Sequence, residues 1–207
     1  MQPNVFDLYN NEIAYYKTPK CGSRTILGWA ALIKDPNLIT ENPDWFSISR
    51  KNIEYPEIRK KVIKYELLTH DQKIRFCIVR DPVDRFISTF TNRILYHKKP
   101  NIDITITDFI KNYDSLIERL EFRDAKFHFT TQTHRIGTNP SLYTHIFNIK
   151  ELYKVKELLE INTKIKLPNL HLNQNGDINK PILTTDEIEW IKDRYHVDYE
   201  IYGKWLL

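Results

Sequence analysis

Short apolar runs alternate along the chain with segments whose apolar residues recur at helical spacing. Three runs, at 13–16, 74–79 and 144–149, are rich in β-branched and aromatic residues and predict buried strands. The predicted helices cover residues 26–33, 56–68, 82–94, 108–120, 150–159 and 184–195. Strands that alternate with helices predict an α/β fold, in which helices flank a mostly parallel central sheet in three layers. No repeat, low-complexity tract or linker divides the chain, so we expect a single domain over residues 1–207.

The composition is that of an ordinary globular protein and narrows the function only slightly. Of the 207 residues 41% are hydrophobic and 28% are charged, and the formal net charge of +4 is compatible with a phosphorylated cofactor, an acidic polysaccharide or nucleic acid. Two cysteines, Cys21 and Cys77, make no disulfide framework and no paired-cysteine metal signature. The first residues lack a signal-peptide pattern, and no apolar run reaches the length of a membrane span. We expect a cytoplasmic protein, or a chain from which a membrane anchor has been removed.

The segment between the first predicted strand and the first predicted helix is the clearest candidate for chemistry. From Tyr15 to Trp29 it reads YYKTPKCGSRTILGW. A strand-to-helix turn of this kind directs unpaired backbone N–H groups, and the positive end of the helix dipole, at whatever lies in front of it. The segment therefore predicts an anion-binding site.

Three familiar anion-binding loops do not match this turn. The P-loop of ATP and GTP enzymes has a lysine directly after its second glycine, whereas Lys20 precedes Gly22 here and the first glycine is missing. A cysteine phosphatase loop needs an arginine where this chain has Leu27 after Cys21. A dinucleotide-binding Gly-x-Gly-x-x-Gly pattern is absent as well. These mismatches disfavour a nucleotide kinase.

A second group of polar residues follows the second predicted strand. Arg80 stands just past the strand, and Ser88 lies about two turns into a helix that Pro82 is expected to open. The carboxyl ends of parallel strands meet at one edge of a sheet, so Arg80 is expected to reach the site that the first turn faces. Arginine and serine both suit a phosphate dianion. The chain thus predicts two phosphate-binding groups, one on each of two βα units.

Both segments resemble motifs of the sulfotransferases that use 3'-phosphoadenosine 5'-phosphosulfate (PAPS). KTPKCGSRT is similar to their 5'-phosphosulfate loop, and IVRDPVDRFIS is similar to their 3'-phosphate motif. Within this superfamily the chain is most similar to the Golgi carbohydrate sulfotransferases and their bacterial relatives. HFTTQTHRIG, YTHIFNIKEL, LPNLHLN and DYEIYG resemble the chondroitin and dermatan branch. The resemblance implies a P-loop-like three-layer fold.

The resemblance also implies a role for individual residues. The 5'-phosphosulfate would be wrapped by Lys20, Cys21, Gly22, Ser23, Arg24 and Thr25. Arg80 and Ser88 would hold the 3'-phosphate. Arg24 departs from the serine or threonine of many members, although heparan N- and 3-O-sulfotransferases also carry arginine there. The implied cofactor is PAPS without a metal, and the implied partner is a carbohydrate or other hydroxylated acceptor, with no nucleic acid and no membrane span.

The implied reaction is an in-line displacement at sulfur, in which the protein mainly positions the groups and neutralises charge. We expect Lys20 to neutralise the leaving oxygen, which makes it a catalytic residue. A base should take the acceptor proton. The resemblance favours Glu41, in the loop after the first helix, with Asp44 as the reserve and His70 as the alternative used in other branches. The acceptor pocket is expected from the loops around 35–55, 96–106 and 125–140.

Several further residues have simpler interpretations. Arg85 is expected to be structural and to pair with a carboxylate such as that of Asp81. Cys21 is expected to pack in the turn, with a pKa lowered by the helix N-terminus. His128 and His134 lack the spacing and the third ligand of a metal site.

Two other functions stay open. A divergent nucleotide kinase would bind ATP with magnesium, which the missing Gly-Lys-Ser argues against. A non-catalytic polyanion-binding module would lose affinity steeply with salt and ignore PAPS.

Overall fold

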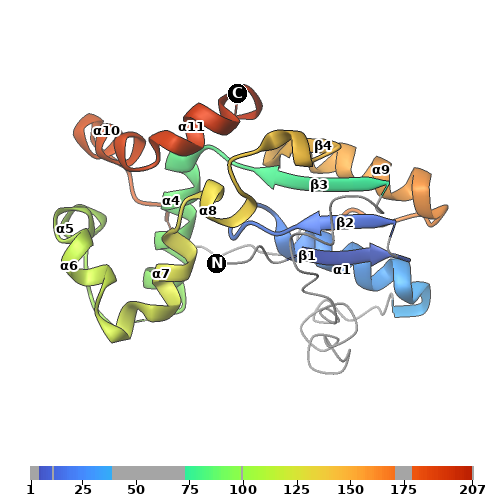
Figure 1. Cartoon of the computed structure of the whole chain (residues 1–207). Helices are drawn as coiled ribbons and strands as arrows, with labels where there is room; N and C mark the ends of the chain where they lie inside the picture. Colours follow the sequence, from blue (N-terminus) through green and yellow to red (C-terminus); the bar gives the residue numbers. More distant parts are fainter. Residues whose placement is uncertain (1–4, 11, 39–72, 99, 171–178, 207) are drawn as a thin grey trace.

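The computed structural model describes residues 5–10, 12–38, 73–98, 100–170 and 179–206 (Figure 1). Its strands are β1 (Val5–Tyr9), β2 (Ile13–Tyr16), β3 (Ile74–Val79) and β4 (His145–Asn148). Its α-helices are α1 (Ser23–Lys34), α4 (Pro82–Phe90), α5 (Ile106–Lys111), α6 (Tyr113–Ile117), α7 (Arg123–Phe129), α8 (Gln132–Ile136), α9 (Leu152–Thr163), α10 (Thr185–Arg194) and α11 (His196–Tyr202). A π-helical segment, Thr91–Tyr96, continues α4. The predicted helix 56–68 lies outside the described residues.

The four described strands form one sheet in the order β1-β2-β3-β4. β2, β3 and β4 are parallel, and β1 pairs with β2 in the antiparallel direction. The register places Tyr16 beside Cys77 and Val79 beside Asn148, so the carboxyl ends of the three parallel strands lie at one edge. The prediction of a mostly parallel α/β sheet is confirmed.

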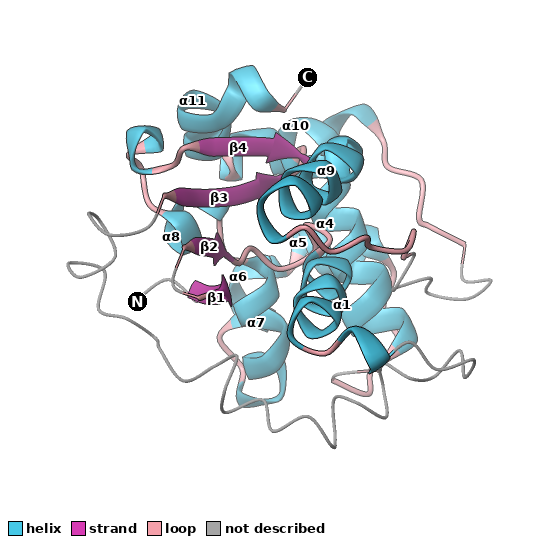
Figure 2. Cartoon of the chain, turned by 90° about the vertical axis from the view of Figure 1, so that its right-hand side faces the viewer, coloured by secondary structure: helices cyan, strands magenta, loops and turns pink. Residues whose placement is uncertain are grey.

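Helices cover both faces of this sheet, which confirms the three layers. One core lies between the sheet and helices α1 and α9, where Tyr15, Phe76 and Phe147 meet Ile26 and Leu159. Figure 2 shows these two helices together on one side of the strands. Residues of the intervening positions, such as Tyr16 and Val79, pack on the other face against residues of α8 and α11. The alternation of side chains along each strand therefore supplies both cores.

A third cluster of buried side chains joins helices to one another. It is centred on the aromatic rings of Phe86, Phe109, Tyr113 and Phe129, whose neighbours lie on α4, α5, α6, α7 and α10. In Figure 1 these helices extend to the side of the sheet at which α4 begins. This cluster supports the segments that border the candidate site.

One predicted helix is divided. The pattern at 108–120 predicted continuous helix, but the structure has α5 and α6 with a break at Asn112, whose φ of −109° is not helical. The Asn112 side chain donates to the carbonyl of Asp108 at 2.9 Å, and the Asn112 backbone N–H donates to the same carbonyl at 3.1 Å. Asparagine side chains that bond to nearby backbone groups in this way are unfavourable inside helices. Apolar spacing alone did not reveal this interruption.

None of the described helices has the length and apolar character required to cross a membrane.

Candidate anion-binding site

The turn between β2 and α1 has a backbone that suits an anion. Gly22 precedes α1 and has a φ of +73°, and Lys20 also lies in the left-handed region with a φ of +67°. A Cβ built on Gly22 would lie 3.1 Å from Cδ2 of Leu152, so both the conformation and the space favour glycine. Because Gly22 has no side chain to cap the helix, the N–H groups of the first turn of α1 are left for a ligand.

Arg80 lies beside this turn, as its place after β3 led us to expect. Its Nη1 donates to the backbone carbonyl of Lys20 with an N–O distance of 3.3 Å. The contact is possible because β2 and β3 are adjacent and parallel, so the segments that follow them leave the sheet at the same edge. The two predicted phosphate-binding groups are therefore neighbours.

Gln132, which the sequence analysis did not single out, connects the two segments. Its Nε2 donates to the carbonyl of Arg80 at 2.9 Å, and its Oε1 accepts from the Arg80 backbone N–H at 2.9 Å. The same Oε1 lies 3.5 Å from Sγ of Cys21. One fully buried amide thus holds the backbone after β3 and the turn after β2 in a fixed relation.

Asp198, also missed, holds Gln132 in place. Its two carboxylate oxygens accept from the backbone N–H groups of Gln132 and Thr133, each at 2.8 Å, and the side chain is fully buried. A carboxylate at the start of α8 also has the sign that favours a helix N-terminus. Since Asp198 and Gln132 are 66 residues apart, no local pattern in the sequence joins them.

Arg85 is structural, but its expected pairing with Asp81 is wrong. The Arg85 side chain is 1% exposed, and its guanidinium donates to the carbonyl of His128 at 3.2 Å and to that of Thr130. Asp81 instead caps α4, accepting from the N–H of Asp84 at 3.1 Å, and accepts from the hydroxyl of Tyr199 at 3.0 Å. The Asp81 carboxylate is thus engaged at the N-cap, and the Arg85 guanidinium is engaged by two backbone carbonyls.

Positive charges gather around Lys20. Burial and, after it, the nearby charges of Arg93, Arg80 and Arg24 together lower the pKa of Lys20 to about 7. Positive charges that lie close together in a partly buried site disfavour each other's charged form, and a bound anion relieves this repulsion. The electrostatics of the turn therefore agree with its backbone geometry in favouring an anionic ligand.

Cys21 packs in the turn as expected, but its pKa moves in the opposite direction from the prediction. The residue is 0% exposed, and burial raises the pKa of its thiol to about 12. The nearby charges of Arg85 and Arg80 lower it only in part. Desolvation therefore outweighs the cations near the thiol, which disfavours the thiolate at neutral pH.

The remaining predicted residues fall into two groups. Ser23 and Arg24 are half-buried in the first turn of α1, Thr25 is buried there, and Ser88 is half-buried on α4. The predicted base Glu41, with its alternatives Asp44 and His70, lies outside the described residues. Among the described residues, no three histidine, cysteine, aspartate or glutamate side chains are placed to bind a metal ion.

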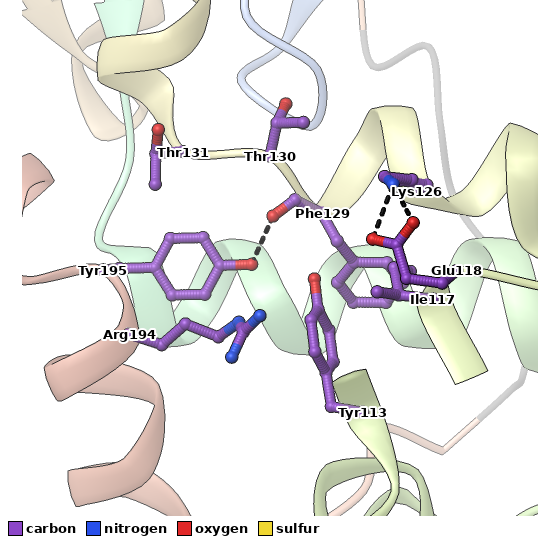
Figure 3. Close-up of a pocket in the computed structure, with 9 residues that line it drawn as sticks. All are labelled: Tyr113, Ile117, Glu118, Lys126, Phe129, Thr130, Thr131, Arg194 and Tyr195. Carbon is purple, nitrogen blue, oxygen red and sulfur yellow. Dashed lines mark hydrogen bonds and ion pairs between the residues drawn. The ribbon is translucent and has the colours of Figure 1, made fainter. Parts of the chain in front are cut away.

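A cavity of about 360 Å³ adjoins the link between α7 and α8 (Figure 3). Its aromatic rings come from Tyr113, Phe129 and Tyr195, and Thr130 and Thr131 contribute the link itself. The hydroxyl of Tyr195 donates to the carbonyl of Phe129 at 2.5 Å, which fixes one side of the cavity. This link leads directly into Gln132, the residue whose side chain contacts Cys21 of the turn.

Comparison with models of protein families assigns the chain to a known family. The model of the sulfotransferase family matches residues 4–204, nearly the whole chain. The chain belongs to the sulfotransferase family. Comparison with curated proteins and with solved structures gave no significant match. As a sulfotransferase the protein is a transferase of sulfuryl groups.

Proposed function

We propose that this sulfotransferase moves a sulfuryl group from PAPS to a hydroxyl, or an amine, of a carbohydrate acceptor. The observation that carries the donor assignment is the contact between Arg80 and the backbone of Lys20, at 3.3 Å. It joins two anion-binding segments from neighbouring βα units. A nucleotide with a phosphate on its 3' side and a phosphosulfate on its 5' side presents one anionic group to each segment.

In this proposal each segment binds one end of the donor. The turn from Lys20 to Thr25 surrounds the 5'-phosphosulfate with backbone N–H groups, hydroxyls and cations. Arg80 and Ser88 hold the 3'-phosphate. The Nε atom of Arg80 is buried and has no hydrogen-bond partner among the described residues, which supports a ligand at this place.

The reaction is a single in-line displacement at sulfur. A bond forms between the acceptor oxygen and sulfur while the bond from sulfur to the 5'-phosphate oxygen breaks, and adenosine 3',5'-bisphosphate leaves. Lys20 neutralises the negative charge that develops on the leaving oxygen. The acceptor proton passes to a base, for which we propose Glu41. None of these steps requires a metal.

The choice of a carbohydrate acceptor rests on the resemblance to the Golgi carbohydrate sulfotransferases. The cavity beside the α7–α8 link supports it, since the cavity combines aromatic rings with hydroxyl groups.

Two buried free thiols, Cys21 and Cys77, support the proposed cytoplasmic location.

Turnover of PAPS with a panel of glycans tests the proposal. The wild-type protein should release adenosine 3',5'-bisphosphate only when an acceptor is present, and Lys20→Ala and Arg80→Ala should reduce the rate by roughly a hundredfold or more. Transfer at the normal rate by either variant would overturn the site assignment. Magnesium-dependent phosphate transfer from ATP would instead favour a divergent nucleotide kinase.

Three variants separate the candidate bases. Glu41→Gln should lower kcat by roughly a hundredfold or more and leave the affinity for adenosine 3',5'-bisphosphate unchanged, because a base acts on the acceptor and not on the donor. Asp44→Asn and His70→Gln are the matched controls, and a larger loss of kcat in either one would move the role to that residue.

A further inference from the structure

Arg93 lies in a part of the molecule whose helical geometry is unusual. It belongs to the π-helical segment Thr91–Tyr96, and the N–H of His97 donates to the carbonyl of Asn92, five residues earlier, at 3.0 Å. π-helical turns are rare and occur frequently at functional sites. The wider turn lets Ile94 stay buried in the helical core while Arg93 reaches towards α7.

Two side chains of α7 hold the Arg93 guanidinium. Its Nη1 lies 3.3 Å from Oδ2 of Asp124, and its Nη2 contacts Nε2 of His128. The Arg93 side chain is only 20% exposed, whereas that of Asp124 is 54% exposed. A guanidinium can only donate, so Nε2 of His128 accepts and its Nδ1 carries the proton. That Nδ1 is buried and makes no hydrogen bond to any described residue.

Arg93 and His128 also lie close enough to the turn after β2 to interact electrostatically with Lys20. After burial, the charge of Arg93 is the largest influence lowering the pKa of Lys20, ahead of Arg80 and Arg24. The pKa of His128 responds to the same groups as that of Lys20. Burial and, after it, the charges of Arg93 and Lys20 lower the pKa of His128 to about 2. His128 is therefore neutral and adds no positive charge beside Arg93 and Lys20.

From this arrangement we infer that Arg93 is a third cation of the 5' site and binds the phosphate that carries the sulfuryl group. His128 and Asp124 are positioning residues that fix the direction of the Arg93 guanidinium. The inference rests on the proposed function, which supplies the donor, and adds a residue that neither sequence motif contains. A planar guanidinium beside Lys20 can bind two oxygens of one phosphate, which the lysine cannot do.

Binding of three nucleotides distinguishes the 5' end of the donor site from the 3' end. Adenosine 5'-monophosphate probes the 5' site, adenosine 3'-monophosphate probes the 3' site, and adenosine 3',5'-bisphosphate probes both. Calorimetric titration of Arg93→Gln should show about tenfold or more weaker binding of the two nucleotides with a 5'-phosphate, the loss expected for one charge-assisted hydrogen bond. Binding of adenosine 3'-monophosphate should stay within about twofold of the wild type.

Further variants separate binding from folding. Arg93→Lys keeps the charge and should recover part of the affinity, and His128→Gln should reduce 5' binding in the same direction but by less. Ser88→Ala should show the opposite selectivity, with loss at the 3' site only. Arg119→Gln is the control, since Arg119 is an exposed arginine paired with Glu121, and it should bind all three nucleotides normally.

The outcomes distinguish this inference from the proposed function. If Arg93→Gln weakens both monophosphates equally, or neither of them, Arg93 does not bind the 5'-phosphate and the inference is overturned while the proposed donor stands. If the wild-type protein binds none of the three nucleotides, the proposed function fails and this inference fails with it.

Discussion

Replacing Gly22 by alanine tests whether the turn after β2 is built as described. The backbone at Gly22 has a φ of +73°, which costs an alanine about 1–2 kcal/mol. The added Cβ would lie 3.1 and 3.2 Å from the two Cδ atoms of Leu152, and such crowding costs about 1–3 kcal/mol. The lower entropy of the unfolded alanine chain offsets about 0.4–1 kcal/mol.

The free energy of unfolding should therefore fall by about 2–4 kcal/mol in Gly22→Ala. Urea titration followed by circular dichroism measures it, and the slope with denaturant should not change. Gly203→Ala is a matched control, because Gly203 has a φ of −49° and its added Cβ meets nothing within 4 Å. That variant should be neutral or slightly stabilising.

The two contributions can be separated in the background of Leu152→Ala. Without the Leu152 side chain the crowding disappears, so the cost of Gly22→Ala should drop to the backbone contribution less the entropy offset, about 1 kcal/mol. Equal stability of Gly22→Ala and Gly203→Ala would refute the description of the turn. An unchanged cost in the Leu152→Ala background would refute the contact with α9 alone.

Three further results follow from buried groups near the site. Lys20→Met should raise the free energy of unfolding near pH 7 and abolish donor binding. The pKa of Lys20 is about 7 in the folded protein and 10.5 in the unfolded chain, so between these pH values the unfolded state binds more protons. The stability of the wild type should therefore rise with pH over this range. Urea titrations at several pH values should show that this rise is missing in Lys20→Met. Asp198→Asn loses an acceptor for the N–H groups of Gln132 and Thr133, so urea titration should show a destabilisation of about 1–3 kcal/mol and calorimetry a weaker adenosine 3',5'-bisphosphate affinity. Cys21 and Cys77 should resist iodoacetamide in the native protein, as mass spectrometry would show, and labelling as fast as in urea would contradict their burial.

Local signals in the sequence predicted the parallel part of the sheet and the helices that begin beside it. Pro82 opens α4, and the capping box of Thr184 and Glu187 opens α10, because each of these signals acts within one turn. β1 was missed. Its residues Val5–Tyr9 include the polar Asp7, so the run lacks the continuous apolar character that marked β2 and β3.

The two anion-binding segments were predictable from the sequence, but the groups that hold them together were not. Gln132, Asp198 and Arg85 act on backbone groups, and any residue offers the same N–H and carbonyl. Their partners are therefore set by the tertiary structure and leave no trace in residue type or spacing. Arg93 was hidden for a similar reason, since only the π-helical turn brings it towards His128 and Lys20.

Calorimetric titration with adenosine 3',5'-bisphosphate, without metal and at moderate salt, tests the central claim most directly. The account predicts tight binding that is lost in Arg80→Ala and is not matched by ATP with magnesium. Failure of the wild-type protein to bind the bisphosphate, or equal binding by Arg80→Ala, would contradict the claim that the turn after β2 and Arg80 together form a donor site.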